Sequence, residues 1–114
     1  MEPVYNAQLL ICLPSTIPDL PFYNLHINVD GDSIGSSYAT EIARELFKEF
    51  EKMWSKEQLT KLLEAIDYKA LRACLDIKII DRQNGMKEIR DGAEEVGHST
   101  IHLFLDLIKQ KVKS

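Results

Sequence analysis

The chain contains few residues that cross-link or interrupt a fold. Its 114 residues include two cysteines, four prolines and five glycines. So few cysteines argue against a disulfide-rich secreted scaffold. No apolar run approaches the roughly 20 residues that span a bilayer, and the start, Met1-Glu2-Pro3-Val4, lacks the basic residues of a secretory signal. We therefore expect a cytoplasmic protein without a membrane segment, with a secreted form that has lost its signal as the alternative.

An excess of basic residues is also missing. Asp and Glu number 18 against 14 Lys and Arg, which gives a net charge of −4 and a pI near 5.3. Nucleic acids and anionic membranes attract basic faces, so this balance disfavours both as ligands. Apolar residues make up 45% and charged residues 28%, the balance of an ordinary globular protein. The length fits a single domain over residues 1–114.

Motifs for catalysis and cofactor binding are absent as well. The chain has no Walker loop, no Gly-x-Gly-x-x-Gly and no Gly-x-Ser-x-Gly elbow. Cys12 and Cys74 lie among apolar residues, which favours two buried free thiols, and a single disulfide between them is the alternative. We expect no catalytic residue and no cofactor.

The first half of the chain predicts two strands and two helices. The continuous apolar run in Ala7–Leu13 is typical of a strand covered on both faces. Apolar and polar residues alternate through Phe22–Val29, as in a half-buried strand. Apolar residues recur at three- and four-residue steps over 36–54, which predicts a long helix. Ser55 and Gln58 then form a capping-box pattern for a second helix over 56–66, with a bend between the two.

The second half predicts a hairpin and a last helix. Leu75–Arg82 alternates, and Asn84-Gly85 is a type I′ turn signal, so we pair this strand with Met86–Arg90. Asp91–Gly97 is interpreted as a polar connection, with the last helix over 99–112 capped by Ser99 or Thr100. The predicted fold class is α+β (mixed α/β), with about four strands and two to three covering helices in the order β-β-α-α-β-β-α.

The most constrained segment is His26-Ile27-Asn28-Val29-Asp30-Gly31-Asp32-Ser33-Ile34-Gly35-Ser36. It locally resembles the first motif of the DHH phosphoesterases, in which a strand carries a histidine and two nearby aspartates before a Gly-Ser helix start. The resemblance implies that His26, Asp30 and Asp32 are metal ligands. Val29 stands where that motif usually has a proline, and the chain has no Asp-His-His motif. The simpler interpretation is that Asp30-Gly31-Asp32 is a turn and that Asp32, Ser33 or Ser36 caps the following helix.

A second candidate for metal binding is the pair His98 and His102. Their i,i+4 spacing would place both on one face of a helix. Because His98 precedes the predicted helix cap, we favour two separate histidines.

The absence of an assembled nucleophile and base favours a non-enzymatic protein that binds another protein. Size and acidity suggest an inhibitor or chaperone of a basic partner, as immunity proteins and antitoxins are. A small metal-dependent phosphoesterase-like enzyme that uses the 26–36 loop is one alternative. The other is a subunit of a larger assembly, in which apolar surface on the last helix meets another chain. The sequence does not indicate an oligomeric state.

Overall fold

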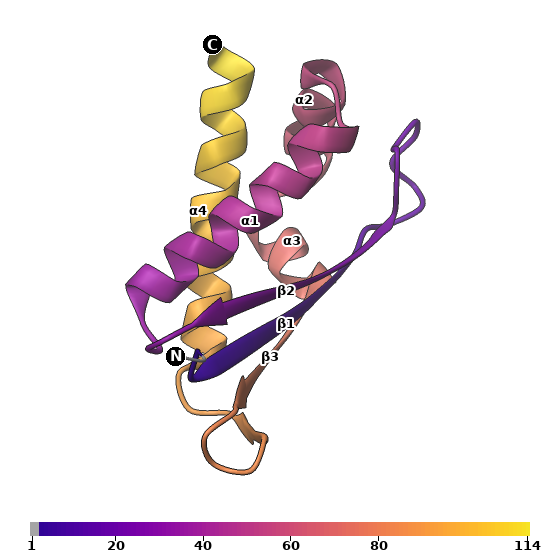
Figure 1. Cartoon of the computed structure of the whole chain (residues 1–114). Coiled ribbons are helices and arrows are strands. Elements are labelled where there is room, and N and C mark those ends of the chain that lie inside the picture. The colour runs from indigo at the N-terminus through magenta and orange to yellow at the C-terminus, as the bar shows by residue number, and fades with distance from the viewer. Residues whose placement is uncertain (1–2) are drawn as a thin grey trace.

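A computed structural model describes residues 3–114 and confirms the α+β class. Four antiparallel strands form one sheet in the order β2-β1-β3-β4, and four helices accompany it (Figure 1). The elements in chain order are β1 (Tyr5–Cys12), β2 (Asn24–Gly31), α1 (Ser36–Met53), α2 (Lys56–Ala65), α3 (Tyr68–Cys74), β3 (Leu75–Asp81), β4 (Lys87–Ile89) and α4 (Ala93–Lys113). Within residues 3–114, none of these helices is both long and apolar enough to cross a bilayer.

The helices cover only one face of the sheet (Figure 1). On that inner face Ala7 of β1 lies between Val29 of β2 and Ile79 of β3, and all three are buried. On the outer face Leu10 is exposed, and so is Cys12. The prediction that the first strand is covered on both faces is therefore wrong. The apolar run includes Leu10 and Cys12, which point to the outer face of the sheet, and no described element covers them.

The core lies between the sheet and the pair α1 and α4. Phe50 of α1 is fully buried, and its ring centroid lies 4.8 Å from that of Phe104 on α4 and 4.9 Å from that of Trp54. Phe22, from the connection between β1 and β2, packs against Phe50 at 5.1 Å. Ile17 of the same connection is buried as well. The proline-containing segment after β1 thus packs against the core.

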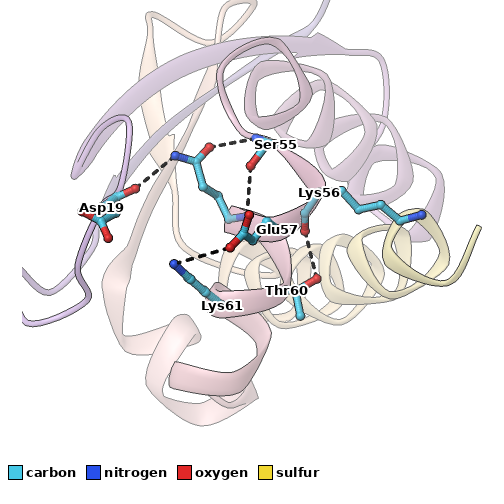
Figure 2. A network of polar contacts seen from close by, with 7 residues as sticks. Asp19, Ser55, Lys56, Glu57, Thr60 and Lys61 are labelled. Carbon is cyan, nitrogen blue, oxygen red and sulfur yellow. Dashed lines mark hydrogen bonds and ion pairs between the residues drawn. The ribbon is translucent and has the colours of Figure 1, made fainter.

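The junction between α1 and α2 follows the sequence signal closely. Ser55 accepts a hydrogen bond from the Gln58 backbone N–H at 3.1 Å, and the Gln58 side-chain oxygen accepts one from the Ser55 N–H at 2.8 Å. The Gln58 side-chain amide also donates to the Asp19 carbonyl at 3.0 Å, which ties the 14–23 segment to α2 (Figure 2). Because Trp54 and Ser55 both have extended backbone, α1 ends and α2 begins in a new direction.

Two helices differ from the prediction. The short helix α3 was not predicted; Asp67 caps it by accepting a hydrogen bond from the Ala70 N–H at 2.8 Å. The last helix begins at Ala93, so Asp91–Gly97 is not a polar connection and neither Ser99 nor Thr100 is a cap. Glu94 and Glu95 lie in the first turn of α4, where the helix dipole favours negative charge.

The hairpin between β3 and β4 exists, but its turn is wider than predicted. Asp81 pairs with Lys87, so residues 82–86 form the loop. The buried carboxylate of Asp81 accepts hydrogen bonds from the Gln83 N–H at 3.0 Å and from the Asn84 side chain at 2.6 Å. Positive φ falls at Gly85 and Met86, not at Asn84. The two-residue type I′ prediction is therefore wrong: the Asp81 carboxylate accepts a hydrogen bond from the Gln83 N–H, which a two-residue turn would direct to the Met86 carbonyl.

Candidate functional site

A hollow of about 470 Å³ lies where β2 passes into α1. Its charged lining consists of Asp30, Asp32 and Glu41, and no basic side chain is found among the described residues that line it. Ser33 and Ser37 contribute hydroxyl groups. Three acidic residues and no basic one around this hollow make it suited to positively charged groups, although the Asp30 carboxylate itself is turned toward Asn6. Glu41 belongs to this surface because α1 turns it toward β2, a relation that the sequence pattern does not contain.

The carboxylate of Asp30 has two partners from neighbouring strands and loops. Its Oδ1 accepts a hydrogen bond from Asn6 Nδ2 at 2.9 Å and lies 3.0 Å from Arg82 Nη2. Asn6 stands directly opposite Asp30 in the β1–β2 pairing. Arg82 follows β3 and reaches Asp30 from the outer side of the sheet. Asp30 is thus partly neutralised, whereas Asp32 and Glu41 form no ion pair with any described residue.

Tyr38 forms the floor of the hollow. Its side chain is 2% exposed, and its hydroxyl donates a hydrogen bond to the Val29 carbonyl at 2.7 Å. Burial raises the pKa of this hydroxyl from 10.0 to about 12. The ring lies directly against Gly31, which lacks the Cβ that would meet it. This contact fixes the last residues of β2 and with them the positions of Asp30 and Asp32.

The hollow continues as a groove along β2. A second cavity of about 450 Å³ shares Asp30 and Glu41 with the first. It runs past Asn28 and Val29 on β2 and past Arg44, Glu45 and Lys48 on α1. We call the two cavities together the β2–α1 groove. Its charged lining contains four carboxylates (Asp30, Asp32, Glu41 and Glu45) and two basic groups, and Lys48 is already paired with Glu45 at 3.2 Å.

One wall of the β2–α1 groove is an edge strand. β2 is the first strand of the sheet and pairs only with β1 among the described strands. Alternate backbone N–H and C=O groups of such a strand point away from its single partner. Figure 1 shows α1 running beside β2 on the helical side of the sheet. An extended peptide laid in the groove could therefore meet both backbone hydrogen-bonding groups and carboxylates.

The structure does not bring His26 to the two aspartates. His26 lies four residues before Asp30 on the same strand, which corresponds to a separation of about 13 Å. It stands on the outer face opposite Leu10, whose other neighbour is Asp76. Within residues 3–114, no group of three His, Cys, Asp or Glu side chains is arranged to hold a metal. The ligand set implied by the phosphoesterase resemblance is therefore not assembled here.

The predicted cap of the long helix is also wrong. Gly35 is the N-cap residue of α1, and no side chain accepts a hydrogen bond from the first turn. Asp30 and Gly31 belong to β2 and do not form a turn with Asp32. Asp32 is exposed and lies three residues before the cap. Its side chain is therefore available to the hollow and is not committed to the helix end.

His98 and His102 lie together on α4, contrary to the prediction that they are separate. Their ring centroids are 4.6 Å apart, and Tyr68 of α3 stacks on His102 at 4.0 Å with an interplanar angle of 11°. The Tyr68 hydroxyl also contacts His98 Nδ1. The sequence missed this cluster because α4 begins six residues before the predicted cap. The i,i+4 spacing places both histidine rings on the face of α4 that contacts Tyr68. The three rings therefore join α3 to α4.

The two thiols are not buried, which corrects the prediction from their apolar neighbours. Cys12 is exposed on the outer face of the sheet and Cys74 is partly exposed; both are free.

No match was found in comparisons with protein-family models, with curated protein sequences or with solved structures.

Proposed function

We propose that this chain is a non-enzymatic protein-binding domain whose β2–α1 groove receives a basic, extended segment of a partner protein. The observation that carries the proposal is the carboxylate-lined hollow at the open edge of β2. An extended segment would add a strand to β2 through backbone hydrogen bonds. Lysine or arginine side chains of that segment would meet Asp32 and Glu41, which have no ion-pair partner among the described residues.

The overall charge supports the same partner class. A net charge of −4 attracts a basic protein before contact and speeds its association. An inhibitor or chaperone of a basic protein, as immunity proteins and antitoxins are, would use this surface in that way. Apolar assembly through the last helix has less support, because the exposed large apolar side chains of the described chain are Leu10, Tyr23, Met53 and Met86. None of these four belongs to α4.

The experiment is a titration of the isotope-labelled protein with a synthetic peptide of alternating lysine and valine, followed by NMR. Amide shifts confined to residues 28–32 and 41–48 support the proposal, and binding should weaken as salt rises because screening reduces the attraction. A peptide of alternating glutamate and valine is the charge control. The same basic peptide with alternate backbone nitrogens methylated should bind more weakly, because it can no longer donate to the β2 edge.

A matched pair of variants tests whether the groove itself is responsible. Asp32→Asn combined with Glu41→Gln should weaken binding of the basic peptide about threefold or more. Glu64→Gln combined with Asp106→Asn removes the same amount of charge from exposed positions outside the groove and should leave the affinity nearly unchanged. Equal weakening in both double variants, or shifts located elsewhere, would overturn the proposal.

A further inference from the structure

The two cysteines adjoin the last residue pair that joins β1 to β3. In the antiparallel pairing of β1 with β3, Leu10 faces Asp76 and Ile11 faces Leu75. Each step forward along β1 is matched by one step back along β3. The pairing ends at Ile11 and Leu75: Cys12 follows Ile11 as the last residue of β1, and Cys74 precedes Leu75 as the last residue of α3. Sequence spacing gives no sign of this relation, because α1 and α2 lie between the two residues.

The strand pairing brings the two cysteines close to one another. Ile11 and Leu75, their neighbours in the chain, are directly opposed, and such residues have Cα atoms about 4.5–5.5 Å apart. Disulfides join Cα atoms separated by about 4.4–6.8 Å. Ile11 is buried on the inner face, so Cys12 lies on the outer face, where it is exposed; Cys74 is partly exposed and packs against the core. No described helix lies over this face, and a small oxidant can reach it.

The two thiols also influence one another electrostatically. Burial raises the pKa of the Cys74 thiol, and the neighbouring Cys12 thiol raises it further. Two thiolates side by side repel, so the pair resists double ionisation. Cys12 is the more exposed of the two and is therefore the better first nucleophile.

We propose that Cys12 and Cys74 form a redox pair that closes to an intramolecular disulfide by exchange with a low-molecular-weight disulfide such as oxidised glutathione. The Cys12 thiolate attacks one glutathione sulfur, forms a mixed disulfide and releases one glutathione thiolate. The Cys74 thiol then loses its proton and attacks the Cys12 sulfur, which releases the second glutathione. The two protein thiols are oxidised, one glutathione disulfide is reduced to two thiols, and the two protons follow the released thiolates.

The disulfide would stabilise the folded state without covering the β2–α1 groove. Cys12 stands opposite Asn24 at the start of β2, whereas the groove carboxylate Asp30 stands opposite Asn6 at the other end. A bond from Cys12 to Cys74 encloses β2, α1, α2 and α3 in one covalent loop. Closing a long loop restricts the unfolded chain, so oxidation stabilises the protein. The inference is independent of the proposed partner binding.

The test incubates the full chain in glutathione buffers of increasing oxidised fraction, blocks remaining thiols by alkylation and measures mass. The expected product is a monomer that has lost two hydrogens and carries no alkyl group. Its unfolding midpoint should rise by at least about 5 °C. Urea at an unfolding concentration should lower the oxidised fraction at the same buffer ratio, because the unfolded chain no longer holds the thiols near each other.

Single variants distinguish formation of the intramolecular disulfide from the reaction of one cysteine alone with glutathione. Cys12→Ser and Cys74→Ser should each stop at a mixed disulfide with glutathione and show no rise in midpoint. Mixed disulfides or cross-linked dimers as the only products of the unmodified protein would overturn the proposal. So would an oxidised fraction that does not change when the protein unfolds.

Discussion

The ring of Tyr38 lies so close to Gly31 that a Cβ atom on Gly31 would stand 2.5 Å from the Tyr38 Cε1 atom. The Tyr38 hydroxyl simultaneously donates a hydrogen bond to the Val29 carbonyl at 2.7 Å. Tyr38, in the first turn of α1, thereby contacts the end of β2 twice: its ring packs against Gly31 and its hydroxyl binds Val29. Because Asp30 and Asp32 flank Gly31, this contact also sets the positions of the carboxylates in the candidate site.

Gly31→Ala should destabilise the protein by about 1–3 kcal/mol, because the added methyl group collides with a buried ring. Chemical denaturation measures the loss. Gly35→Ala is the comparison: a Cβ at Gly35 meets nothing within 4 Å, so this variant should lose only the preference for Gly over Ala at the N-cap, about 0.5 kcal/mol. Similar costs at the two glycines would contradict the close approach of Tyr38.

Tyr38→Phe should cost about 1–2 kcal/mol at neutral pH, because the buried Val29 carbonyl loses its donor. The variant should also change the alkaline limb of the stability curve. The Tyr38 pKa is about 12 in the folded protein against 10.0 for an ordinary tyrosine. The neutral hydroxyl therefore favours the fold below pH 10, and this contribution is lost as pH rises from 10 toward 12.

Urea unfolding at a series of pH values between 8 and 12 measures this dependence. The difference in stability between the unmodified protein and Tyr38→Phe should shrink above pH 10. Tyr23→Phe, at an exposed tyrosine, serves as the control and should keep the alkaline slope of the unmodified protein. A constant difference across the series would show that Tyr38 does not titrate in this way.

Leu46→Ala should cost about 2–5 kcal/mol, because it leaves a cavity in the core. Leu46 is 1% exposed and Phe50, one turn later, is fully buried. Met53→Ala on the same helix is the control, since Met53 is 59% exposed and should change stability by no more than about 0.5 kcal/mol. A loss of stability below about 0.5 kcal/mol for Leu46→Ala would show that α1 does not pack in the core.

Asp32→Ala should leave stability within about 0.5 kcal/mol of the unmodified protein, because Asp32 caps no helix. Ser55→Ala, which removes an actual cap, should cost about 1 kcal/mol. Equilibrium unfolding of both variants makes the comparison. A cost for Asp32→Ala equal to that of Ser55→Ala would restore the capping role that the sequence suggests.

Calorimetric titration with Mn²⁺ or Mg²⁺ should reveal no saturable submillimolar site. Asp30 already has Asn6 and Arg82 as partners, and His26 stands about 13 Å further along the strand. A saturable site that disappears in Asp30→Asn, together with hydrolysis of a phosphodiester, would instead support the phosphoesterase alternative. Asp76→Asn, on the outer face of β3, is the control for nonspecific carboxylate binding.

Much of the fold could be predicted because its signals are local. The apolar stripe of α1, the Ser55–Gln58 capping box and the alternation in β2 each depend on residues within a few positions of one another. Errors arose where a distant or buried group intervened. The Asp81 carboxylate widened the hairpin loop, and the outer sheet face left Leu10 and Cys12 exposed although their sequence neighbours are apolar.

The candidate site was predictable only in part. The sequence by itself determined that Asp30 and Asp32 follow an alternating strand and precede a long amphipathic helix, because periodicity is a property of neighbouring residues. Only the tertiary structure decided that Glu41 joins them, that Arg82 pairs with Asp30 and that His26 stands apart. It also placed Cys12 and Cys74 beside the last residue pair between β1 and β3, and it gathered Tyr68, His98 and His102. These relations follow from strand register and helix packing, which bring together residues far apart in the chain.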